Sequence, residues 1–363
     1  MKNDCASSGR ALCAKVSGMN VMMLTGIRKM EMRDVRVPAL KREDDVLIRM
    51  SAVGVCGSDV HYYRTGRIGS QVVKYPFAVG HEGAGVVEKI GCGVTRVRPG
   101  DRVAIEPAMP CWKCDQCRAG RHHTCRSLRF LGCPGQAGGC LAEYLLMPET
   151  SCFRVGKGMA MELAALSEPL AIGIYCSRMS GRTPGSRVAI LGSGPIGLSV
   201  LLAEKARGVH KLYVTDKIPE RLAMARRIGA AWTGNASGRA LVGKILEREP
   251  LGMDVVYECC GQQEAIDQAV DLLEPGGRLL MVGIPTVDRV SFRIDRMRRK
   301  EICVQNIRRQ VDCAEVALDM LASGRIRAGA MITHKFSFED TKKAFDMVAG
   351  YKDGVVKAMI DFG

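Results

Sequence analysis

The sequence has no long run of apolar residues. No stretch of the 363 residues approaches the roughly 20 apolar residues that a membrane-spanning helix needs, so we expect no membrane span. The first eighteen residues contain no apolar block long enough for a signal peptide and no periodicity of a folded element. We therefore expect residues 1–18 to be a disordered extension, and we expect a cytoplasmic protein.

Aromatic residues are scarce, at 5%, and no basic stripe is interleaved with them. The net charge is nevertheless +15, from 53 Lys plus Arg against 38 Asp plus Glu, and the only dense basic cluster is RMRRK at 296–300. Scattered basic residues without aromatic partners disfavour nucleic-acid binding. A positive field that attracts an anionic cofactor or substrate explains the excess better.

The chain also lacks the short length and export signal of a disulfide-linked secreted domain, although it has 16 cysteines. We therefore expect a reducing compartment, in which grouped cysteines serve as metal ligands. One group has the spacing C-x2-C-x2-C-x7-C and consists of Cys111, Cys114, Cys117 and Cys125. Four thiolates favour a tetrahedral, structural Zn²⁺ with no open position. An iron–sulfur cluster is the alternative, but bacterial ferredoxins continue this spacing with x3-C-P.

Residues 187–285 alternate short apolar strands with amphipathic helices. The expected strands are RVAIL (187–191), KLYVT (211–215), DVVYECC (254–260) and GRLLMVG (277–283). Strands that alternate with helices predict a parallel, doubly wound sheet with right-handed crossovers.

Residues 19–150 contain short strand-like runs that Gly, Pro and Asp divide, such as DVLIRM (45–50) and GAGVVEKIG (83–91). That pattern predicts a β-rich domain with many turns. Helices and a terminal strand, GVVKAMIDF, are expected after about residue 310 and should pack back on this domain. The expected fold is thus α/β, with a parallel-sheet domain of residues 169–308 inserted into a β-rich domain of residues 19–168 and 309–363.

A glycine-rich loop follows the first strand of the expected parallel sheet. It reads G-x-G-x-x-G and comprises Gly192, Ser193, Gly194, Pro195, Ile196 and Gly197. Between a strand and a helix, this loop predicts a pyrophosphate site at the helix N-terminus. The next strand ends at Asp216, whose carboxylate can accept the ribose hydroxyls of NAD and would repel the 2′-phosphate of NADP. Lys217 and Arg221 could assist a 2′-phosphate, so NADP is the less favoured alternative.

Three further residues form a candidate catalytic metal site. Cys56, His81 and a carboxylate would leave an open coordination position, as in catalytic zinc sites. The candidate carboxylates are Glu82, next to His81 in VGHEG, and Glu168 in SEPL. Each residue alone also has a structural explanation. Cys56 could be a small buried side chain, His81 could cap a turn, and Glu168 could cap the helix that begins at Pro169. The spacing in the sequence does not show that these residues meet in space.

The motifs GVCGSDVHYY, GHE, the four-cysteine group, EPL, GSGPIG and TD occur in this order over about residues 19–363. Together they resemble the zinc-containing medium-chain dehydrogenases, and among these the polyol branch of sorbitol (L-iditol 2-) and xylitol dehydrogenases. The resemblance implies a GroES-like catalytic domain with an inserted Rossmann domain. It also implies two zinc ions per chain, one catalytic and one structural, and a homo-oligomer that is a tetramer or a dimer.

The resemblance assigns roles to individual residues. The residues that match the catalytic zinc ligands are Cys56, His81 and Glu82. Glu168 matches the carboxylate that holds the zinc-bound water or exchanges with it. Ser58 matches the hydroxyl in the proton path. Residues that match the substrate pocket are Tyr62, Phe130, Glu168 and Arg309. The family's usual F-R-Y is here I-R-R-Q, with Gln310 in place of tyrosine, so the preferred polyol stays open.

The expected reaction is oxidation of a secondary hydroxyl of a polyol of the sorbitol, xylitol or L-iditol type by NAD, giving the ketose. Zn²⁺ would lower the pKa of the alcohol, and hydride would pass to the nicotinamide. The proton would leave through Glu168, water and Ser58. The alternatives are an L-threonine 3-dehydrogenase, a secondary alcohol or butanediol dehydrogenase, and a non-catalytic NAD-binding regulatory relative.

Overall fold

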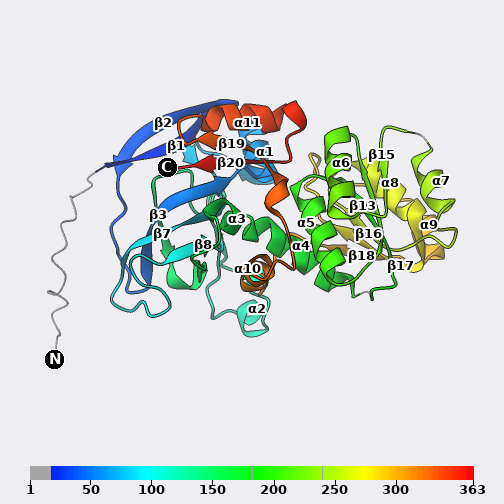
Figure 1. The fold of residues 1–363 in the computed structure, drawn as a ribbon, viewed down its shortest axis with the longest axis horizontal. Coiled ribbons are helices and arrows are strands. Elements are labelled where there is room, and N and C mark those ends of the chain that lie inside the picture. The colour runs from blue at the N-terminus through cyan, green and yellow to red at the C-terminus, as the bar shows by residue number, and fades with distance from the viewer. Residues whose placement is uncertain (1–17, 182, 239) are drawn as a thin grey trace.

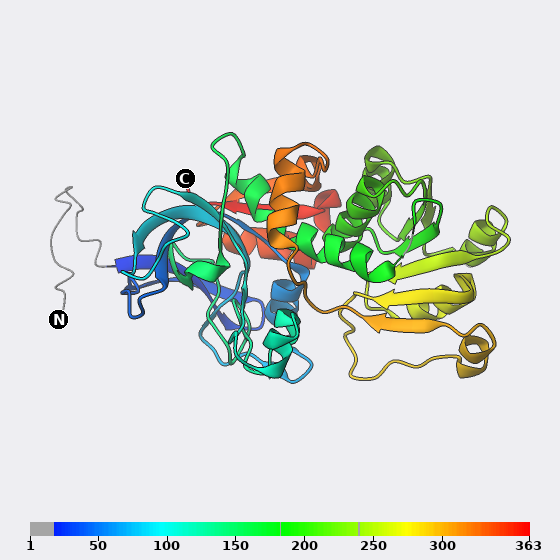
Figure 2. The ribbon, with the colours of Figure 1, turned by 90° about the horizontal axis from the view of Figure 1, so that it is seen from below.

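The computed structural model describes residues 18–181, 183–238 and 240–363, which form an elongated molecule of two lobes (Figure 1). Residues 1–17 of the expected extension lie outside the described residues, and the first strand begins at Gly18. One lobe contains the early strands together with the C-terminal segment, and the middle of the chain forms the other lobe (Figures 1 and 2). Within the described ranges, no helix has the length and apolar character that crossing a membrane requires.

A seven-stranded sheet forms the centre of the first lobe. Its strands, in spatial order, are β12 (Cys152–Arg154), β8 (Arg102–Ile105), β7 (Glu82–Ile90), β3 (Asp45–Gly54), β20 (Lys357–Asp361) and β19 (Ile332–Ser337), with β11 (Tyr144–Pro148) also paired to β3. The last strand, β20, runs antiparallel to β3, and Met359 pairs with Gly54. The C-terminal segment therefore completes a sheet that the N-terminal part of the chain begins.

Further elements complete the first lobe. Its other strands are β1 (Gly18–Gly26), β2 (Lys29–Arg36), β4 (Arg67–Ile68), β5 (Gln71–Val72), β6 (Phe77–Ala78), β9 (Ala108–Met109) and β10 (Arg129–Phe130). The helices are α1 (Gly57–Thr65), α2 (Asp115–Arg118), α3 (Met161–Ala165), α10 (Ala314–Ala322) and α11 (Thr341–Ala349). The 3-10 turns are η1 (His122–Thr124), η2 (Glu149–Ser151), η3 (Gly329–Met331) and η4 (Lys352–Gly354).

The second lobe contains a six-stranded sheet whose strands all run parallel. Its spatial order is β15 (Trp232–Asn235), β14 (Lys211–Asp216), β13 (Arg187–Leu191), β16 (Met253–Glu258), β17 (Leu273–Met281) and β18 (Cys303–Asn306). This is the 3-2-1-4-5-6 order of a dinucleotide-binding sheet. The predicted α/β fold with an inserted parallel sheet is confirmed.

Helices cover both faces of the parallel sheet. They are α4 (Ser167–Ser180), α5 (Pro195–Ala206), α6 (Pro219–Ile228), α7 (Leu241–Leu246), α8 (Gln263–Leu272) and α9 (Ile294–Arg299). Because side chains alternate along a strand, Val188 and Ile190 of β13 pack in one hydrophobic cluster with α4, α5 and α6. Ala189 and Leu191 pack in another cluster with α7 and α8.

Helix α4 joins the two lobes and packs closely against α5. Gly173 of α4 is buried, and a Cβ atom placed on it would lie 2.4 Å from the carbonyl carbon of Ser199 in α5. The cluster that contains this contact also includes Ala52, Ala84 and Ala104 of the first lobe. The lobes therefore share a continuous core, and the spacing of α4 and α5 helps to set their relative position.

We expect Gly173→Ala to destabilise the protein, because its methyl group would push α4 away from the backbone of α5. Overpacking of this kind costs about 1–3 kcal/mol. The matched control is Gly243→Ala in α7, where a Cβ atom would meet nothing within 4 Å. Removing glycine from an exposed helix stabilises by about 0.5–1 kcal/mol. Urea unfolding of both variants measures the difference, and an equal shift of both in one direction would contradict this packing.

Candidate active site

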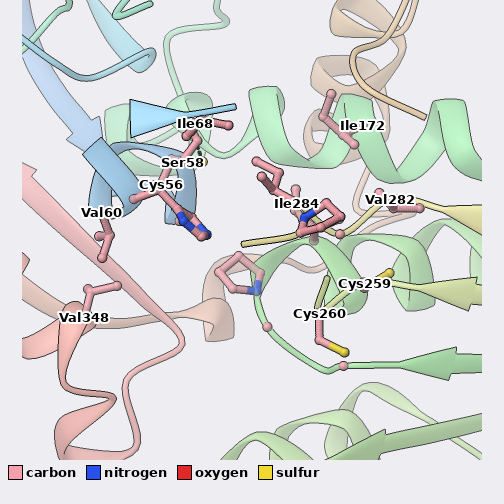
Figure 3. Close-up of a pocket in the computed structure, with 18 of the residues that line it drawn as sticks. Cys56, Ser58, Val60, Ile68, Ile172, Cys259, Cys260, Val282, Ile284 and Val348 are labelled. Atoms are coloured by element: carbon pink, nitrogen blue, oxygen red, sulfur yellow. Dashed lines mark hydrogen bonds between the residues drawn. The ribbon is translucent and has the colours of Figure 1, made fainter. Parts of the chain in front are cut away.

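A cavity of about 830 Å³ lies between the lobes and is lined by both. Figure 3 shows Cys56, Ser58 and Val60 on one side, next to the β-rich lobe, and Cys259, Cys260, Val282 and Ile284 on the other side, at the strand ends of the parallel sheet. Ligands of open α/β sheets bind at the carboxyl ends of the strands. The cavity therefore lies where a nucleotide on the sheet would meet side chains of the other lobe.

The structure brings Cys56, His81 and Glu82 together on one wall of this cavity. Cys56 is the N-cap of α1, His81 directly precedes β7, and Glu82 is the first residue of β7. Their candidate ligand atoms all lie within 4.8 Å of one another. Gly80 precedes them with a φ of 100°, and a Cβ atom on it would lie 3.0 Å from the Leu141 side chain. A glycine is therefore needed at the turn that directs His81 to the site.

The surroundings of His81 suit a metal ligand. Its Nδ1 lies 3.3 Å from Oδ1 of the buried Asp59, which leaves Nε2 directed to Cys56 and Ser58. A carboxylate on the second ring nitrogen is the usual support of a metal-binding histidine. Burial lowers the pKa of His81, but the Asp59 carboxylate and Cys56 raise it well above its usual value. The site therefore stabilises a positive charge, and a Cys–His–Glu donor set with an open position fits a catalytic Zn²⁺.

Glu82 forms a fully buried ion pair with Lys357 of β20. Lys357 Nζ donates to both carboxylate oxygens, at 2.7 and 2.6 Å, and to the Val55 carbonyl at 3.2 Å. Each side chain is only 1% exposed. Burial lowers the pKa of Lys357, but Glu82 and Cys56 raise it above its usual value, so the lysine carries its charge. The ion pair with Lys357, in the last strand, therefore fixes the position of the Glu82 carboxylate.

Glu168 and Ser58 lie beside this group without belonging to it. Glu168, in the first turn of α4, lines the same cavity but is not among the atoms that cluster within 4.8 Å. Burial, together with the Glu82 and Glu106 carboxylates, raises the pKa of Glu168 to about 8 against the opposing effect of His81. Ser58 donates to Cys56 Sγ at 3.3 Å and lies 3.5 Å from His81 Nε2.

The four grouped cysteines also converge. The sulfur atoms of Cys111, Cys114, Cys117 and Cys125 all lie within 4.8 Å of one another. Backbone N–H groups of Arg126 and Cys117 lower the pKa of Cys114 to about 6, which favours the thiolate. This four-sulfur set fits a closed tetrahedral Zn²⁺ site. None of the 14 cysteines in the described part of the chain forms a disulfide.

The glycine-rich loop lines the opposite side of the cavity. Gly194 is the N-cap of α5 and Pro195 its first residue. A Cβ atom on Gly197 would lie 1.8 Å from the Gly192 carbonyl oxygen, so only glycine permits this turn. Asp216 accepts hydrogen bonds from Ser193 N at 2.7 Å and from Ile218 N at 2.9 Å. Its carboxylate is therefore fixed next to the loop, at the end of β14.

The two basic candidates near Asp216 have other partners. Lys217 forms an exposed ion pair with Glu264 at 3.4 Å. Arg221 is buried, donates to the Val355 carbonyl at 3.1 and 3.3 Å, and lies over the ring of Tyr351 at 5.2 Å. Arg221 therefore connects the nucleotide side of the cavity to the β-rich lobe.

The expected substrate residues line the cavity near His81. Tyr62 is buried and donates to Gln71 Oε1 at 3.2 Å. The Phe130 ring lies 5.5 Å from the His81 ring, and the Arg309 guanidinium lies 4.0 Å from the centre of the Phe130 ring. Gln310, which replaces the family's tyrosine, donates through Nε2 to Glu106.

Sequence reasoning missed four residues at this site: Asp59, Lys357, Glu106 and Cys133. Cys133 lines the cavity, and its sulfur accepts from Gln71 Nε2 at 2.8 Å and lies 3.9 Å from Tyr62 Oη. Lys357 carried a signal, since a lysine within the apolar strand VVKAMI is unusual in a buried sheet. Glu106 follows the strand-like run RVAI and is half-buried in the cavity wall, where desolvation raises its pKa to about 7. Asp59 and Cys133 had no such signal, because their partners lie far away in the sequence.

Two family descriptions match the chain. Residues 42–157 match the alcohol dehydrogenase GroES-like domain, and residues 195–323 match the zinc-binding dehydrogenase family. The first match contains Cys56, His81 and the four-cysteine group, and the second begins at Pro195 in the glycine-rich loop.

Curated relatives extend over nearly the whole chain. Sorbitol dehydrogenase of Bacillus subtilis is 34% identical over 343 residues, which cover 94% of this chain and 97% of the relative. Sorbitol dehydrogenase of Gallus gallus is 35% identical, and the match covers 91% of this chain and 93% of the relative. L-Idonate 5-dehydrogenase of Vitis vinifera is 34% identical, with 90% of each chain covered.

Solved structures also match over nearly the whole chain. An oxidoreductase of unknown specificity from Escherichia coli has a TM-score of 0.90 and 30% identity, with 95% of this chain and 99% of that chain covered. A zinc-binding dehydrogenase of Sinorhizobium meliloti, solved with NADP, has a TM-score of 0.87 and 29% identity. The match covers 95% of this chain and 100% of that chain. An alcohol dehydrogenase of Escherichia coli, solved with NADH, has a TM-score of 0.88 and 26% identity. The match covers 95% of this chain and 100% of that chain.

We expect the purified protein to hold two zinc ions per chain, one at each cluster. Cys56→Ala should reduce the content to one zinc and leave the fold intact, because the remaining cluster braces its own loop. Cys114→Ala should also reduce the content to one zinc, and it should lower the melting temperature as well. Mass-spectrometric metal analysis of the two variants checks this. Two zincs retained by Cys56→Ala would contradict its assignment as a ligand.

We expect Lys357→Met to destabilise the metal-free protein by about 3–5 kcal/mol, because it leaves the Glu82 carboxylate buried without a partner. Zinc should restore part of this loss by compensating the carboxylate. The control is Lys335→Met, which breaks the more exposed Lys335–Glu162 ion pair and should cost less than about 1 kcal/mol. Urea unfolding with and without zinc measures both. Equal losses in the two variants would contradict a supporting role for Lys357.

Proposed function

This chain belongs to the zinc-containing medium-chain dehydrogenases, in their polyol branch, and we propose that it oxidises a secondary hydroxyl of a polyol to a ketone with NAD. The family assignment makes it a zinc-dependent oxidoreductase that uses a nicotinamide cofactor and acts on polyols or alcohols. The proposal adds NAD as the cofactor and a polyol of the sorbitol, xylitol or L-iditol type as the substrate.

One observation carries the proposal. The Cys56–His81–Glu82 group and the glycine-rich loop line the same cavity from opposite lobes. A substrate hydroxyl at the first and a nicotinamide extending from the second would meet within this cavity. Binding that brings two reactants together in this way accounts for a large part of the rate of many enzymes.

When bound, Zn²⁺ acts as a Lewis acid that lowers the pKa of a hydroxyl at its open position, and the nicotinamide accepts a hydride. We assign the proton transfer to two residues of this chain. Ser58 Oγ, near Cys56 Sγ and His81 Nε2, can take the proton from such a hydroxyl only as it releases its own hydroxyl proton to a water, so it acts as a relay. The Glu168 carboxylate, whose pKa burial raises to about 8, can hold that proton reversibly near neutral pH.

The polar wall near His81 supports a polyol rather than an apolar alcohol. Tyr62 Oη, Gln71 and the Arg309 guanidinium all line the cavity, so they can pair with several hydroxyl groups of one substrate. A site built from hydrogen-bonding groups rejects a substrate that leaves them unpaired. Because Gln310 donates to Glu106, it contributes a different group to this wall than a tyrosine would.

Asp216 and its neighbours support NAD over NADP. The carboxylate is fixed at the end of β14 by two backbone N–H groups, where it would face the ribose of a bound nucleotide. A 2′-phosphate placed there would meet a negative charge. Lys217 and Arg221, which could neutralise it, are engaged by Glu264 and by the Val355 carbonyl.

A substrate panel with both cofactors tests the proposed function. Zinc-replete protein should reduce NAD with at least one of sorbitol, xylitol, L-iditol and galactitol, and more slowly with L-threonine and 2,3-butanediol. NAD should exceed NADP in kcat/KM by about tenfold or more, which corresponds to ~1.4 kcal/mol.

The panel also separates the alternatives. Oxidation of L-threonine or butanediol alone would indicate another zinc dehydrogenase. If no member of the panel were oxidised while both zinc ions were bound, a non-catalytic relative would be indicated.

A further inference from the structure

A short hairpin brings Gln71 into the wall of the cavity. Strands β4 and β5 pair antiparallel, with Ile68 opposite Gln71, and both side chains line the cavity. Ile68 lies on the same side of the cavity as Cys56 and Ser58 (Figure 3). Because side chains alternate along a strand, the neighbouring Val72 points the other way and is 57% exposed. The hairpin therefore directs the Gln71 amide toward the substrate side of the cavity.

The Gln71 amide connects two buried side chains of different segments. Its Oε1 accepts the hydroxyl proton of Tyr62, in α1, at 3.2 Å. Its Nε2 donates to the sulfur of Cys133, which follows β10, at 2.8 Å. Tyr62 and Cys133 are each 4% exposed. The hydrogen bonds therefore run in one direction, from the phenol through the amide to the thiol.

This direction fixes the orientation of the Tyr62 proton. A phenol has one O–H donor, and its remaining capacity is to accept. The Cys133 sulfur also lies near Tyr62 Oη, at 3.9 Å, but sulfur is a weak acceptor. Burial and the neighbouring Cys133 raise the pKa of Tyr62 well above its usual value, so the phenol keeps its proton. Tyr62 therefore donates to Gln71 and offers an acceptor to a ligand in the cavity.

An acceptor that is fixed before the substrate binds contributes to selectivity. A substrate hydroxyl can donate to Tyr62 Oη, whereas an ether, a carbonyl or a hydrogen atom at the same place cannot. A freely turning phenol would pair with donors and acceptors alike. Polar groups that are held in advance by their neighbours reject substrates that leave them unpaired.

We propose that Gln71 is a positioning residue that determines substrate specificity. By taking the proton of Tyr62, it fixes Tyr62 Oη as a hydrogen-bond acceptor for a second hydroxyl of the substrate, apart from the one that reacts. The inference rests on the proposed function, because it takes the reacting hydroxyl to lie at the Cys56–His81–Glu82 group. Tyr62 makes the contact, and Gln71 gives that contact its direction.

The first test compares two substrates with the zinc-replete enzyme and NAD. One is the polyol that the wild-type protein oxidises best, and the other is 2-butanol, whose single hydroxyl leaves none for Tyr62. Gln71→Met keeps the length of the side chain but removes the acceptor. It should lower kcat/KM about tenfold for the polyol, the order of one neutral hydrogen bond, and less than about twofold for 2-butanol.

The matched control is Val72→Thr, which changes the adjacent, exposed side chain of the same hairpin and should alter neither rate. Equal losses for the two substrates in Gln71→Met would indicate a general structural effect and would overturn the inference. An unchanged polyol rate in Gln71→Met would overturn it as well, while the proposed function would stand.

A double-mutant cycle tests whether Gln71 acts through Tyr62. Once Tyr62→Phe has removed the phenol, Gln71→Met should lower the polyol rate no further, whereas additive losses would contradict a positioning role. Gln71→Glu keeps an acceptor for the Tyr62 proton but loses the donor to Cys133, so it should recover most of the polyol rate. A loss as large as that of Gln71→Met would show that the proton does not point to residue 71.

A binding measurement separates this inference from the proposed function. If the wild-type protein oxidises no polyol, the proposed function fails, and calorimetric titration of xylitol into the zinc-loaded, NADH-bound protein still tests Gln71. Weaker binding in Gln71→Met, with Val72→Thr unchanged, would support its role. Equal binding in all three proteins, or no binding to the wild type, would overturn it.

Discussion

The buried ion pair between Glu82 and Lys357 is the interaction on which the arrangement of the site depends. It joins the first residue of β7 to the first residue of β20, and the same ammonium binds the Val55 carbonyl next to Cys56. Three segments that are far apart in the sequence are thereby fixed around one point. β20 also pairs with β3. The last part of the chain therefore completes the sheet and also places the Lys357 ammonium next to the metal-binding group.

Charge is distributed unevenly along the cavity, and this unevenness explains its chemistry. At one end, Asp59 and Cys56 lie against His81, and together they stabilise a positive charge there. At the other end, Arg309 is buried against the Phe130 ring, and the negative charge of Glu106 acts on it without a hydrogen bond between them. The first end therefore favours a divalent cation, and the second offers a guanidinium beside the polar groups of the substrate wall.

The parallel-sheet part of the fold and the four-cysteine group have local patterns in the sequence, whereas the Cys56–His81–Glu82 set was assigned only through the family resemblance. The strand over 187–191 was predicted to the residue, since a continuous apolar run precedes a glycine-rich turn. The edge strands β15 and β18 were not anticipated, because each has four residues and no clear alternation. Lys357 and Asp59 could not be assigned from spacing, because their roles arise only from contacts with Glu82 and His81. Gln310 was recognised as a departure, but its partner Glu106 was not.

The central claim is that the Cys56–His81–Glu82 group binds the zinc ion on which the reaction depends. Returning zinc stepwise to the metal-free protein, while measuring NADH formation from the best substrate, tests it most directly. Activity should rise in proportion to the occupancy of this one site and stay absent in Cys56→Ala at every zinc concentration. Full activity of the metal-free protein, or of Cys56→Ala loaded only at the four-cysteine group, would contradict the account.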